Sequence, residues 1–275
     1  KAPAGIGSAE LGGRWTGGVD GWSRTGGAST TAISYLRGVG MDYYNMYLYK
    51  YGGVDQNTGL PLFYHRVSQA DHAAGRWEDI ALGGDVKTTN YTMADRYEMG
   101  SALPKWIGGF NTSFRYKSFD FSAILAYQLG GKFLSVEYAN SMYINSNLGS
   151  ALSAELIGNT WTPENKDAKF PMAFYNNSFF TSGATIGSWM YTDMSLFSSS
   201  YLNIKNISVG YNLPAKYLQK VKASNIRIFA SADNVAMITG HSGFDPRMSL
   251  VGGLEVGAYA YPYMSTVSMG VNIDF

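Results

Sequence analysis

Three histidines are the residues of this chain best suited to metal binding or acid–base chemistry: His65, His72 and His241. The first two are expected to lie in a loop, so they are not held as a pair of ligands on one helix or strand. The acidic residues nearby, Asp71 and Glu78-Asp79, are expected to be solvated loop charges. The sequence contains neither an HExxH nor a GxSxG motif, and it has no cysteine. We therefore predict no enzymatic activity, no catalytic or metal-binding residues and no cofactor.

One acidic segment resembles the start of a cation-binding loop. Asp55-Gln56-Asn57-Thr58-Gly59 is rich in oxygen ligands, but a calcium loop also needs a third oxygen ligand and an acidic residue at its twelfth position. The twelfth position here is Arg66. The segment is therefore interpreted as a glycine turn between Tyr51 and Leu60.

Aromatic residues gather in residues 139–200, a long segment between strand-like patterns. Rings beside amides and carboxylates suit oligosaccharides, because the rings stack on sugar faces while the polar groups bind hydroxyls, and they suit peptides almost as well. The candidate contacts for a substrate or partner are Trp161, Phe174, Tyr175, Trp189, Tyr191 and Asp193. Packing within the loop itself is the structural alternative. It is the favoured one for Trp161-Thr162-Pro163-Glu164-Asn165.

Composition limits the elements that can position these residues. The chain has 275 residues, of which 45% are hydrophobic and only 15% charged, and it contains 33 glycines and 21 tyrosines. The net charge of +1 argues against a nucleic-acid-binding protein. No run approaches the roughly 18 apolar residues of a membrane-spanning helix, and the amino terminus does not resemble a signal peptide. An all-β transmembrane barrel, in which only alternate residues face lipid, is favoured over a soluble β-sandwich.

Strict alternation of apolar and polar residues predicts five strands. The clearest lies at 264–275, with apolar residues at Val267, Met269, Val271, Ile273 and Phe275. The others lie at 225–235, 201–212, 118–138 and 104–117, with 35–51 as a sixth candidate. A change of phase near Lys205-Asn206 predicts a β-bulge. The segment 118–138 is interpreted as one long strand kinked at Gly130-Gly131.

The connections between these strands alternate in length. The turn at 117/118 is very short and 213–224 is modest, whereas 139–200 and 236–263 are long. Outer-membrane barrels have short periplasmic turns and long extracellular loops. With Phe275 on the periplasmic side, both short connections fall on that side and both long loops face outward. Five or six strands are too few for a closed barrel, so we expect either further strands in 1–103 or a larger barrel.

The alternation also assigns the two faces of each strand. The apolar positions are expected to face lipid, with Trp106, Tyr116, Tyr127 and Tyr211 in the interfacial girdles. The polar positions are expected to line the lumen: Asn111, Arg115, Asp120, Arg227, Asp233 and Asn272. Val271, Ile273 and the terminal Phe275 form a pattern similar to the signal that the outer-membrane insertion machinery reads.

Several motifs in order resemble those of the SusC/RagA-type TonB-dependent outer-membrane transporters. The resemblance runs from about Tyr43 to Phe275, and its most specific stretch extends from Tyr201 to Pro214. Other matching stretches include Tyr51-Gly52-Gly53-Val54-Asp55, Gln128-Leu129-Gly130-Gly131-Lys132, Trp161-Thr162-Pro163-Glu164-Asn165, Ser231-Ala232-Asp233-Asn234 and Gly243-Phe244-Asp245-Pro246. Arg247 departs from the family pattern, because an acidic residue commonly follows Asp245-Pro246.

The resemblance implies that residues 1–275 are the carboxy-terminal segment of a single barrel domain of about 22 strands with a plugged lumen. In this family the plug and the segment that contacts TonB precede the barrel, and neither is recognised in this chain. The remaining barrel strands are expected from the preceding part of the polypeptide. The implied location is the outer membrane of a Gram-negative bacterium, in contact with lipid and lipopolysaccharide.

The function that the resemblance implies is nutrient uptake. The expected activity is the import of oligomeric substrates, either glycan oligosaccharides or peptides, energised by a TonB complex. The expected partner is a SusD-like lipoprotein on the extracellular face, and two such transporter–lipoprotein pairs can form a dimer. Two alternatives stay open: a complete small barrel acting as a pore or enzyme, and a soluble carbohydrate-binding β-domain.

Overall fold

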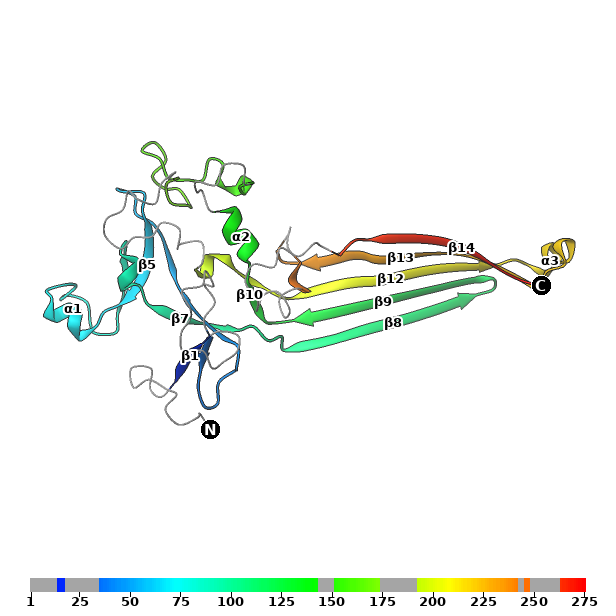
Figure 1. Ribbon diagram of the computed structural model, residues 1–275, viewed down its shortest axis with the longest axis horizontal. Coiled ribbons are helices and arrows are strands. Elements are labelled where there is room, and N and C mark those ends of the chain that lie inside the picture. The colour runs from blue at the N-terminus through cyan, green and yellow to red at the C-terminus, as the bar shows by residue number, and fades with distance from the viewer. Residues whose placement is uncertain (1–13, 18–34, 143–150, 174–191, 242–244, 248–262) are drawn as a thin grey trace. The chain divides into compact units, whose positions relative to one another are not determined.

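The computed structural model describes residues 14–17, 35–142, 151–173, 192–241, 245–247 and 263–275 (Figure 1). The chain forms two compact units that alternate along the sequence. The first comprises Lys1–Ala102, Phe133–Phe197 and Leu250–Tyr259, and the second comprises Leu103–Lys132, Ser198–Ser249 and Ala260–Phe275. In the three larger sheets, neighbouring strands run antiparallel, which confirms the predicted all-β antiparallel fold.

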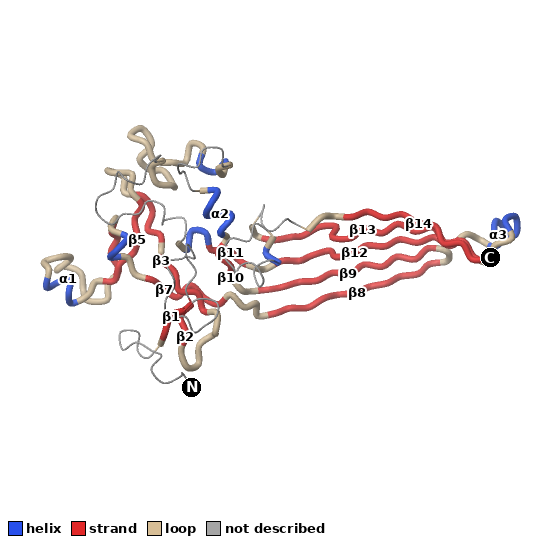
Figure 2. The backbone as a smooth tube through the Cα atoms, viewed as in Figure 1, coloured by secondary structure: helices blue, strands red, loops and turns tan. Residues whose placement is uncertain are grey.

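The second unit contains one five-stranded sheet in the order β14-β13-β12-β9-β8. Its strands are β8 (Trp106–Tyr116), β9 (Phe119–Leu129), β12 (Tyr201–Asn212), β13 (Asn225–Thr239) and β14 (Thr266–Asp274). They are 9 to 15 residues long, and Figure 2 shows them side by side over most of their length. All five strands predicted from the alternation are present.

The short connections lie at one end of this sheet. Lys117 and Ser118 form the turn between β8 and β9, and Lys117 adopts a left-handed conformation with φ of 53°. The connection between β12 and β13 contains a short helix, α3 (Ala215–Val221). Asn225 at the start of β13 pairs with Asp274, so both connections lie at the end that carries the carboxy terminus (Figure 1). The predicted sorting of the short connections is confirmed.

The two faces of the five-stranded sheet differ in chemistry. On the apolar face, cross-strand neighbours are hydrophobic, as in the pairs of Phe114 with Phe121 and Ile228 with Val271. The polar face carries the residues that alternate with them. Phe229 is an aromatic exception on the polar face, and it lies over Gly270, where a Cβ would approach its ring to 2.5 Å.

A bulge interrupts the register between β12 and β13. Lys205 of β12 lies opposite two residues of β13, Asn234 and Val235. The register between β12 and β9 shifts at the same place, and Asn234 adopts φ of 50°. The predicted bulge near Lys205-Asn206 is confirmed, and the neighbouring strand accommodates it with an extra residue of its own. Bulges redirect the side chains next to them, here those around Lys205 of β12.

Two sheets of shorter strands lie wholly within the described part of the first unit. One sheet has the order β1-β2-β3-β7 and is formed by β1 (Trp15–Gly17), β2 (Tyr35–Arg37), β3 (Asn45–Tyr49) and β7 (Arg96–Ser101). The other has the order β4-β5-β6 and is formed by β4 (Tyr51–Val54), β5 (Pro61–Arg66) and β6 (Asp85–Thr88). Met46 and Leu48 of β3 are each 1% exposed and pack in a core with Tyr35. The candidate strand 35–51 is therefore three strands, and the buried side of β3 is the parity opposite to Tyr47 and Tyr49.

The prediction of one kinked strand over 118–138 is wrong. β9 ends at Leu129, and Gly130 and Gly131 both adopt positive φ, 80° and 78°, which turns the chain out of the sheet. The next residues form β10 (Lys132–Leu134), which pairs with β11 (Leu196–Ser198) in a separate two-stranded sheet. A helix follows, α2 (Val136–Ser141), because the Ser135 hydroxyl accepts a hydrogen bond from the Tyr138 N–H and caps its amino end.

Helical segments are short in the described residues. The helix α1 (Gln69–Ala73) follows β5, and 3₁₀ turns lie at Tyr91–Met93, Ala154–Leu156 and Asp193–Ser195. None of the helices in the described part of the chain is long and apolar enough to cross a bilayer.

Candidate functional site

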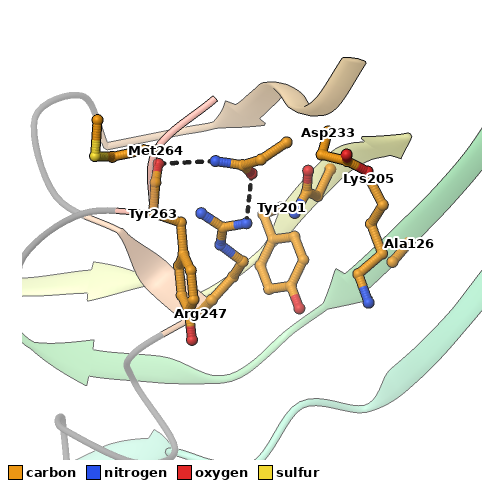
Figure 3. Close-up of a pocket in the computed structure, with 9 residues that line it drawn as sticks. Ala126, Tyr201, Lys205, Asp233, Arg247, Tyr263 and Met264 are labelled. Carbon is orange, nitrogen blue, oxygen red and sulfur yellow. Dashed lines mark hydrogen bonds between the residues drawn. The ribbon is translucent and has the colours of Figure 1, made fainter. Parts of the chain in front are cut away.

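A pocket lies on the polar face of the five-stranded sheet, at the end opposite to the carboxy terminus. Its volume is about 410 Å³, which falls in the range of about 300–1,000 Å³ for small-molecule sites. Its lining comes from β9 (Ala126), β12 (Tyr201, Asn203, Lys205), β13 (Asp233, Asn234) and the residues Arg247, Tyr263 and Met264 (Figure 3).

Asn234 connects the sheet to the rim of the pocket. Its side-chain amide donates a hydrogen bond to the carbonyl of Tyr263 (2.8 Å), and its side-chain oxygen accepts one from Nη1 of Arg247 (2.8 Å), as the dashed lines in Figure 3 show. The Ser265 hydroxyl donates a hydrogen bond to the backbone carbonyl of Asn234 at 2.6 Å. The bulge therefore turns one asparagine toward two chain segments that are distant in sequence, and it holds both against β13.

Arg247 is the second connection at the rim. Its Nε lies 2.9 Å and 3.0 Å from the two carboxylate oxygens of Asp245, and its guanidinium carbon lies 4.5 Å from the centre of the Tyr263 ring. The hydrogen bonds that Arg247 donates to Asp245 hold the pKa of Arg247 above its ordinary value, so this side chain stays charged. The neighbouring carboxylate of Asp245 therefore neutralises the charge of Arg247.

Three polar residues of the pocket differ in burial: Asn203 is buried, whereas Lys205 and Asp233 are exposed. Asn203 is 1% exposed, yet its side-chain oxygen accepts no hydrogen bond from any described residue. The Lys205 side chain is exposed, and no hydrogen bond or ion pair with a described residue engages it. Asp233 accepts one hydrogen bond, from the Asn206 amide to Oδ1 (2.7 Å). Figure 3 shows Lys205 and Asp233 across the pocket from Arg247 and Tyr263.

Farther along the polar face, an ion pair spans β12. Arg227 of β13 donates hydrogen bonds to both carboxylate oxygens of Asp120 on β9. Both residues belong to the set predicted to line the lumen. The remaining members of that set that the structure places on this face, Asn111, Arg115 and Asn272, are exposed.

In the first unit, Trp161 packs against the turn of a hairpin. Its indole Nε1 donates to the carbonyl of Gln56 at 3.1 Å, and a Cβ on Gly59 would approach its ring to 2.5 Å. The Gly59 N–H donates to the carbonyl of Asp55 (2.7 Å), and Gly59 adopts φ of 71°, so the interpretation of this segment as a glycine turn is confirmed. The Asp55 carboxylate accepts hydrogen bonds from the Asn57 N–H and the Thr58 hydroxyl within the turn.

The other candidate contacts in 139–200 have different outcomes. Asp193 accepts a hydrogen bond from the backbone N–H of Tyr51 at 2.8 Å, so its carboxylate braces β4. Phe174, Tyr175, Trp189 and Tyr191 lie outside the described residues. A role for this set in binding a substrate or partner stays a prediction.

The loop assignment of His65 and Asp71 is wrong. His65 lies in β5 and is 8% exposed, with Nε2 2.9 Å from Asp71 and Nδ1 2.9 Å from Asp95. Asp71 is 3% exposed and caps α1, and hydrogen bonds from the Ser68 hydroxyl and N–H hold the pKa of this carboxyl well below its usual range. The sequence does contain a signal for this helix start, because Ser68 and Asp71 have the spacing of a capping box, with Ser68 as the N-cap and Asp71 as the third helical residue.

Asn203, Lys205 and Tyr201 were not singled out from the sequence as a site. The available signal was the bulge, because an extra residue in a strand redirects side chains near it. The contribution of Tyr263 could not be found in this way, since it depends on how a long connection returns to the sheet.

No protein family model matches the chain. In sequence, the chain is similar to TonB-dependent receptor P3 of Formosa agariphila, with 28% identity over 242 residues that make up 84% of this chain and 22% of that protein. It is also similar to TonB-dependent receptor P39 of the same organism, with 28% identity over 185 residues, which are 66% of this chain and 17% of that protein. The chain therefore spans about a fifth of the length of these relatives.

In structure, the chain is similar to the solved RagAB peptide transporter, with a TM-score of 0.65 and 23% identity over 90% of this chain and 24% of that chain. The RagAB peptide importer in its open-open state gives a TM-score of 0.57 at 22% identity over the same shares. At this level of identity the likeness shows the fold. The sequence relatives and the fold together support the resemblance of this chain to the carboxy-terminal barrel region of SusC/RagA-type TonB-dependent transporters.

Proposed function

We propose that this chain forms part of the wall of an outer-membrane barrel that imports nutrients into a Gram-negative bacterium. The exposed apolar face of the five-stranded sheet carries this proposal. Trp106, Phe110 and Phe114 are 69%, 62% and 63% exposed, and a contiguous apolar surface of this kind marks contact with a partner or a membrane. Lipid is the contact that suits it, because the face is formed by regular alternation on every strand and not by one local patch.

The dimensions of the strands support the same placement. A tilted strand crosses the apolar layer of a membrane with about 9–11 residues, and β8 has 11. Trp106 is the first residue of β8 and Tyr116 is the last. Tryptophan and tyrosine are the residues enriched where strands of such barrels meet the two interfaces.

The imported substrate is proposed to be an oligomer, either a glycan oligosaccharide or a peptide. The relatives in sequence are TonB-dependent receptors and the solved relative is a peptide transporter. We infer that energy comes from a TonB complex acting on a plug in another part of the polypeptide, and that residues 1–275 belong to one barrel domain. A SusD-like lipoprotein is the inferred extracellular partner, with Trp161, Phe174, Tyr175, Trp189, Tyr191 and Asp193 as candidate loop contacts.

Transport in this part of the barrel needs binding and conformational change but no covalent step. The polar face would line the lumen, where the Asp120–Arg227 pair neutralises its own charges. Open polar groups in the pocket can hold and release a solute by hydrogen bonds.

Uptake measurements test the proposal directly. Cells that lack the complete gene encoding this chain, cells that lack TonB and wild-type cells are supplied with fluorescent oligosaccharide and peptide pools. The expected result is loss of uptake of one pool in both mutants and its recovery when the gene is restored. Unchanged uptake of both pools in the gene deletion contradicts an import function, and uptake that needs the gene but not TonB contradicts the energy source.

A further inference from the structure

The two short connections of the five-stranded sheet carry positive charge and no negative charge. The turn between β8 and β9 contains Lys117, and residues 213–224 contain Lys216, Lys220 and Lys222 but neither aspartate nor glutamate. The side chains of Lys117, Lys216 and Lys222 are exposed, and none of the three makes a hydrogen bond or ion pair with a residue that the structure describes. These three lysines define a basic end of the sheet, where the carboxy terminus also lies (Figure 1).

The acids of the strands at this end do not neutralise the lysines, because they lie on the polar face and bind other residues. Asp120 accepts hydrogen bonds from Arg227 with both carboxylate oxygens. The Asp274 carboxylate accepts a hydrogen bond from the side-chain amide of Asn225 at 3.1 Å. Charge at this end is therefore sorted, with the acids on the polar face and the lysines on the connections.

An aromatic row places part of the basic end beside the apolar face. Tyr116, Phe119 and Tyr211 are cross-strand neighbours on three adjacent strands, and the ring centres of Phe119 and Tyr211 are 4.6 Å apart. The Nζ of Lys117 lies 5.3 Å from the centre of the Tyr116 ring. Because Tyr116 belongs to the apolar face, the charge of Lys117 lies beside that face. A lysine in this position keeps its stem along apolar surface and its ammonium group in water.

The helix α3 repeats the pairing of a lysine with a tyrosine. The Nζ of Lys216 lies 4.8 Å from the centre of the Tyr217 ring, and Tyr217 is 47% exposed. Tyrosine and lysine are both favoured at membrane–water interfaces, where one end of the side chain is in an apolar layer and the other end is wet. The basic end therefore fits a surface that combines an apolar layer with negative charge. A folded acidic protein or a cell-wall polymer offers the charge without that layer.

We propose that the basic end of the sheet binds the phosphate groups of anionic phospholipids, with Lys117 and Lys216 as the contacts beside the tyrosine rings. The inference rests on the proposed barrel wall, with the carboxy-terminal end of the sheet on the periplasmic side, where the membrane leaflet consists of phospholipid. It adds a preference for headgroup charge to the proposed contact with lipid. Lysine binds phosphate as a point charge, and each basic residue near an anionic membrane surface strengthens binding about fivefold.

The test measures which lipids gather beside Lys117 in the complete transporter. A fluorophore is attached to Ser118→Cys in a background without other cysteines, and the protein is reconstituted in phosphatidylcholine vesicles. Nitroxide-labelled phosphatidylglycerol or nitroxide-labelled phosphatidylcholine is then titrated into the vesicles. The ratio of the two quenching constants gives the local preference for an anionic headgroup.

Two substitutions and one control test the lysines. Lys117→Gln and Lys216→Gln, alone and combined, each remove a charge from an exposed position at the basic end. The matched control is Lys105→Gln, which removes the same charge from an exposed position beside Trp106, at the opposite end of β8.

The expected result is a preference for phosphatidylglycerol that falls about fivefold in Lys117→Gln, falls less in Lys216→Gln and is unchanged in Lys105→Gln. Added sodium chloride should weaken the preference, because exposed charges are screened by salt. Equal quenching by the two lipids in the wild type overturns the proposal, as does a preference that survives in the combined variant. A fluorescence change caused by soluble peptidoglycan fragments, without any lipid preference, overturns it in favour of the cell wall.

The same fluorophore separates failure of this inference from failure of the proposed function. Equal quenching by both lipids would show that this end of the sheet contacts the membrane without a preference for charge, so only the phospholipid site would be wrong. Quenching by neither lipid would show that this end of the sheet lies away from the bilayer, which contradicts the proposed barrel wall itself.

Discussion

Arg227 forms a two-point contact with Asp120 although a whole strand, β12, separates their strands. The distances are 3.2 Å from Nε to Oδ1 and 2.5 Å from Nη2 to Oδ2. The contact is possible because the residue between them is Gly210, where a Cβ would lie 2.5 Å from Nη2 of Arg227 and from Oδ1 of Asp120. Charge-assisted, two-point contacts of this kind are among the stronger hydrogen bonds. Three strands are thereby fastened together on the polar face.

Replacing Gly210 with alanine should break this contact. The expected loss in free energy of unfolding is about 1.5–3 kcal/mol, the usual range for hydrogen bonds to charged groups, measured by urea unfolding in lipid vesicles. In an Asp120→Asn, Arg227→Gln background the same substitution should cost almost nothing, since there is no ion pair to disturb. Ser208→Ala on the same face of β12 is the matched control. Equal costs in both backgrounds would show that the glycine serves another purpose.

Arginine scanning of β14 should distinguish its two faces. Met269 is 82% exposed on the apolar face, opposite Ala230, whereas Ser268 lies on the polar face opposite Ser231. Met269→Arg should cost about 2–4 kcal/mol near the bilayer midplane, and Ser268→Arg much less. Val271→Arg should resemble Met269→Arg, and Ile273→Arg should cost less because it lies closer to the end of the strand. Equal folding yields of Met269→Arg and Ser268→Arg in vesicles would refute the assigned faces.

Deleting Phe275 should impair insertion. Its ring is 88% exposed and follows a strand whose apolar residues alternate, and we propose that the insertion machinery reads this pattern. The deletion should lower the amount of protein in the outer membrane while leaving its synthesis unchanged, as measured by pulse labelling and membrane fractionation. Phe275→Tyr is the conservative control and should insert nearly normally. Wild-type surface levels of the truncated protein would rule out this role.

The five-stranded sheet could be predicted from the sequence because each of its strands faces two different environments. Regular alternation then appears in the residues themselves, and a break in it revealed the bulge at Lys205. The same signal misled beyond Leu129. Leu134, Val136 and Tyr138 share a parity, but only Leu134 lies in a strand, β10, whereas Val136 and Tyr138 belong to α2, whose amino end is capped by Ser135.

The pocket and the buried cluster around His65 were much harder to foresee. Asn203 is one of many polar residues on the polar face, and the pocket that it lines also includes Asp233 and Arg247, which lie 30 and 44 positions away in the sequence. His65 is brought between Asp71 and Asp95 by the return of the chain through α1 and β6. Neither the amino-acid composition nor the alternation of apolar and polar residues predicts such contacts, because they depend on the path of irregular connections between strands.

The capping aspartate gives the first unit a dependence on acidity. Hydrogen bonds from Ser68 are the main reason that the pKa of Asp71 lies below its ordinary value of 3.8 in the folded state. The carboxylate therefore stabilises the folded state at pH values above 3.8, and this stabilisation is lost as the pH falls from 3.8 toward the lowered pKa. Asp71→Asn should therefore unfold at a lower temperature than wild type at pH 7, and the difference should shrink as the pH falls below about 4. Asp79→Asn, an exposed neighbour, should show no such difference. A gap between Asp71→Asn and wild type that is constant with pH would contradict this assignment.

The last prediction concerns topology and the inferred lipoprotein. Lys166 and Lys169 in the segment 139–200 are exposed, and so are Lys216 and Lys222 in the connection that contains α3, at the end of the sheet with the carboxy terminus. If that end is periplasmic, trypsin added to intact cells should never cut at Lys216 or Lys222, but should do so after the outer membrane is permeabilised. It should cut at Lys166 or Lys169 in cells without the lipoprotein and more slowly when the partner covers the loops. Cleavage at Lys216 in intact cells would show that the proposed topology is inverted. Equal cleavage at Lys169 with and without the lipoprotein would contradict only the proposed lipoprotein contact, because the strand order does not depend on that partner.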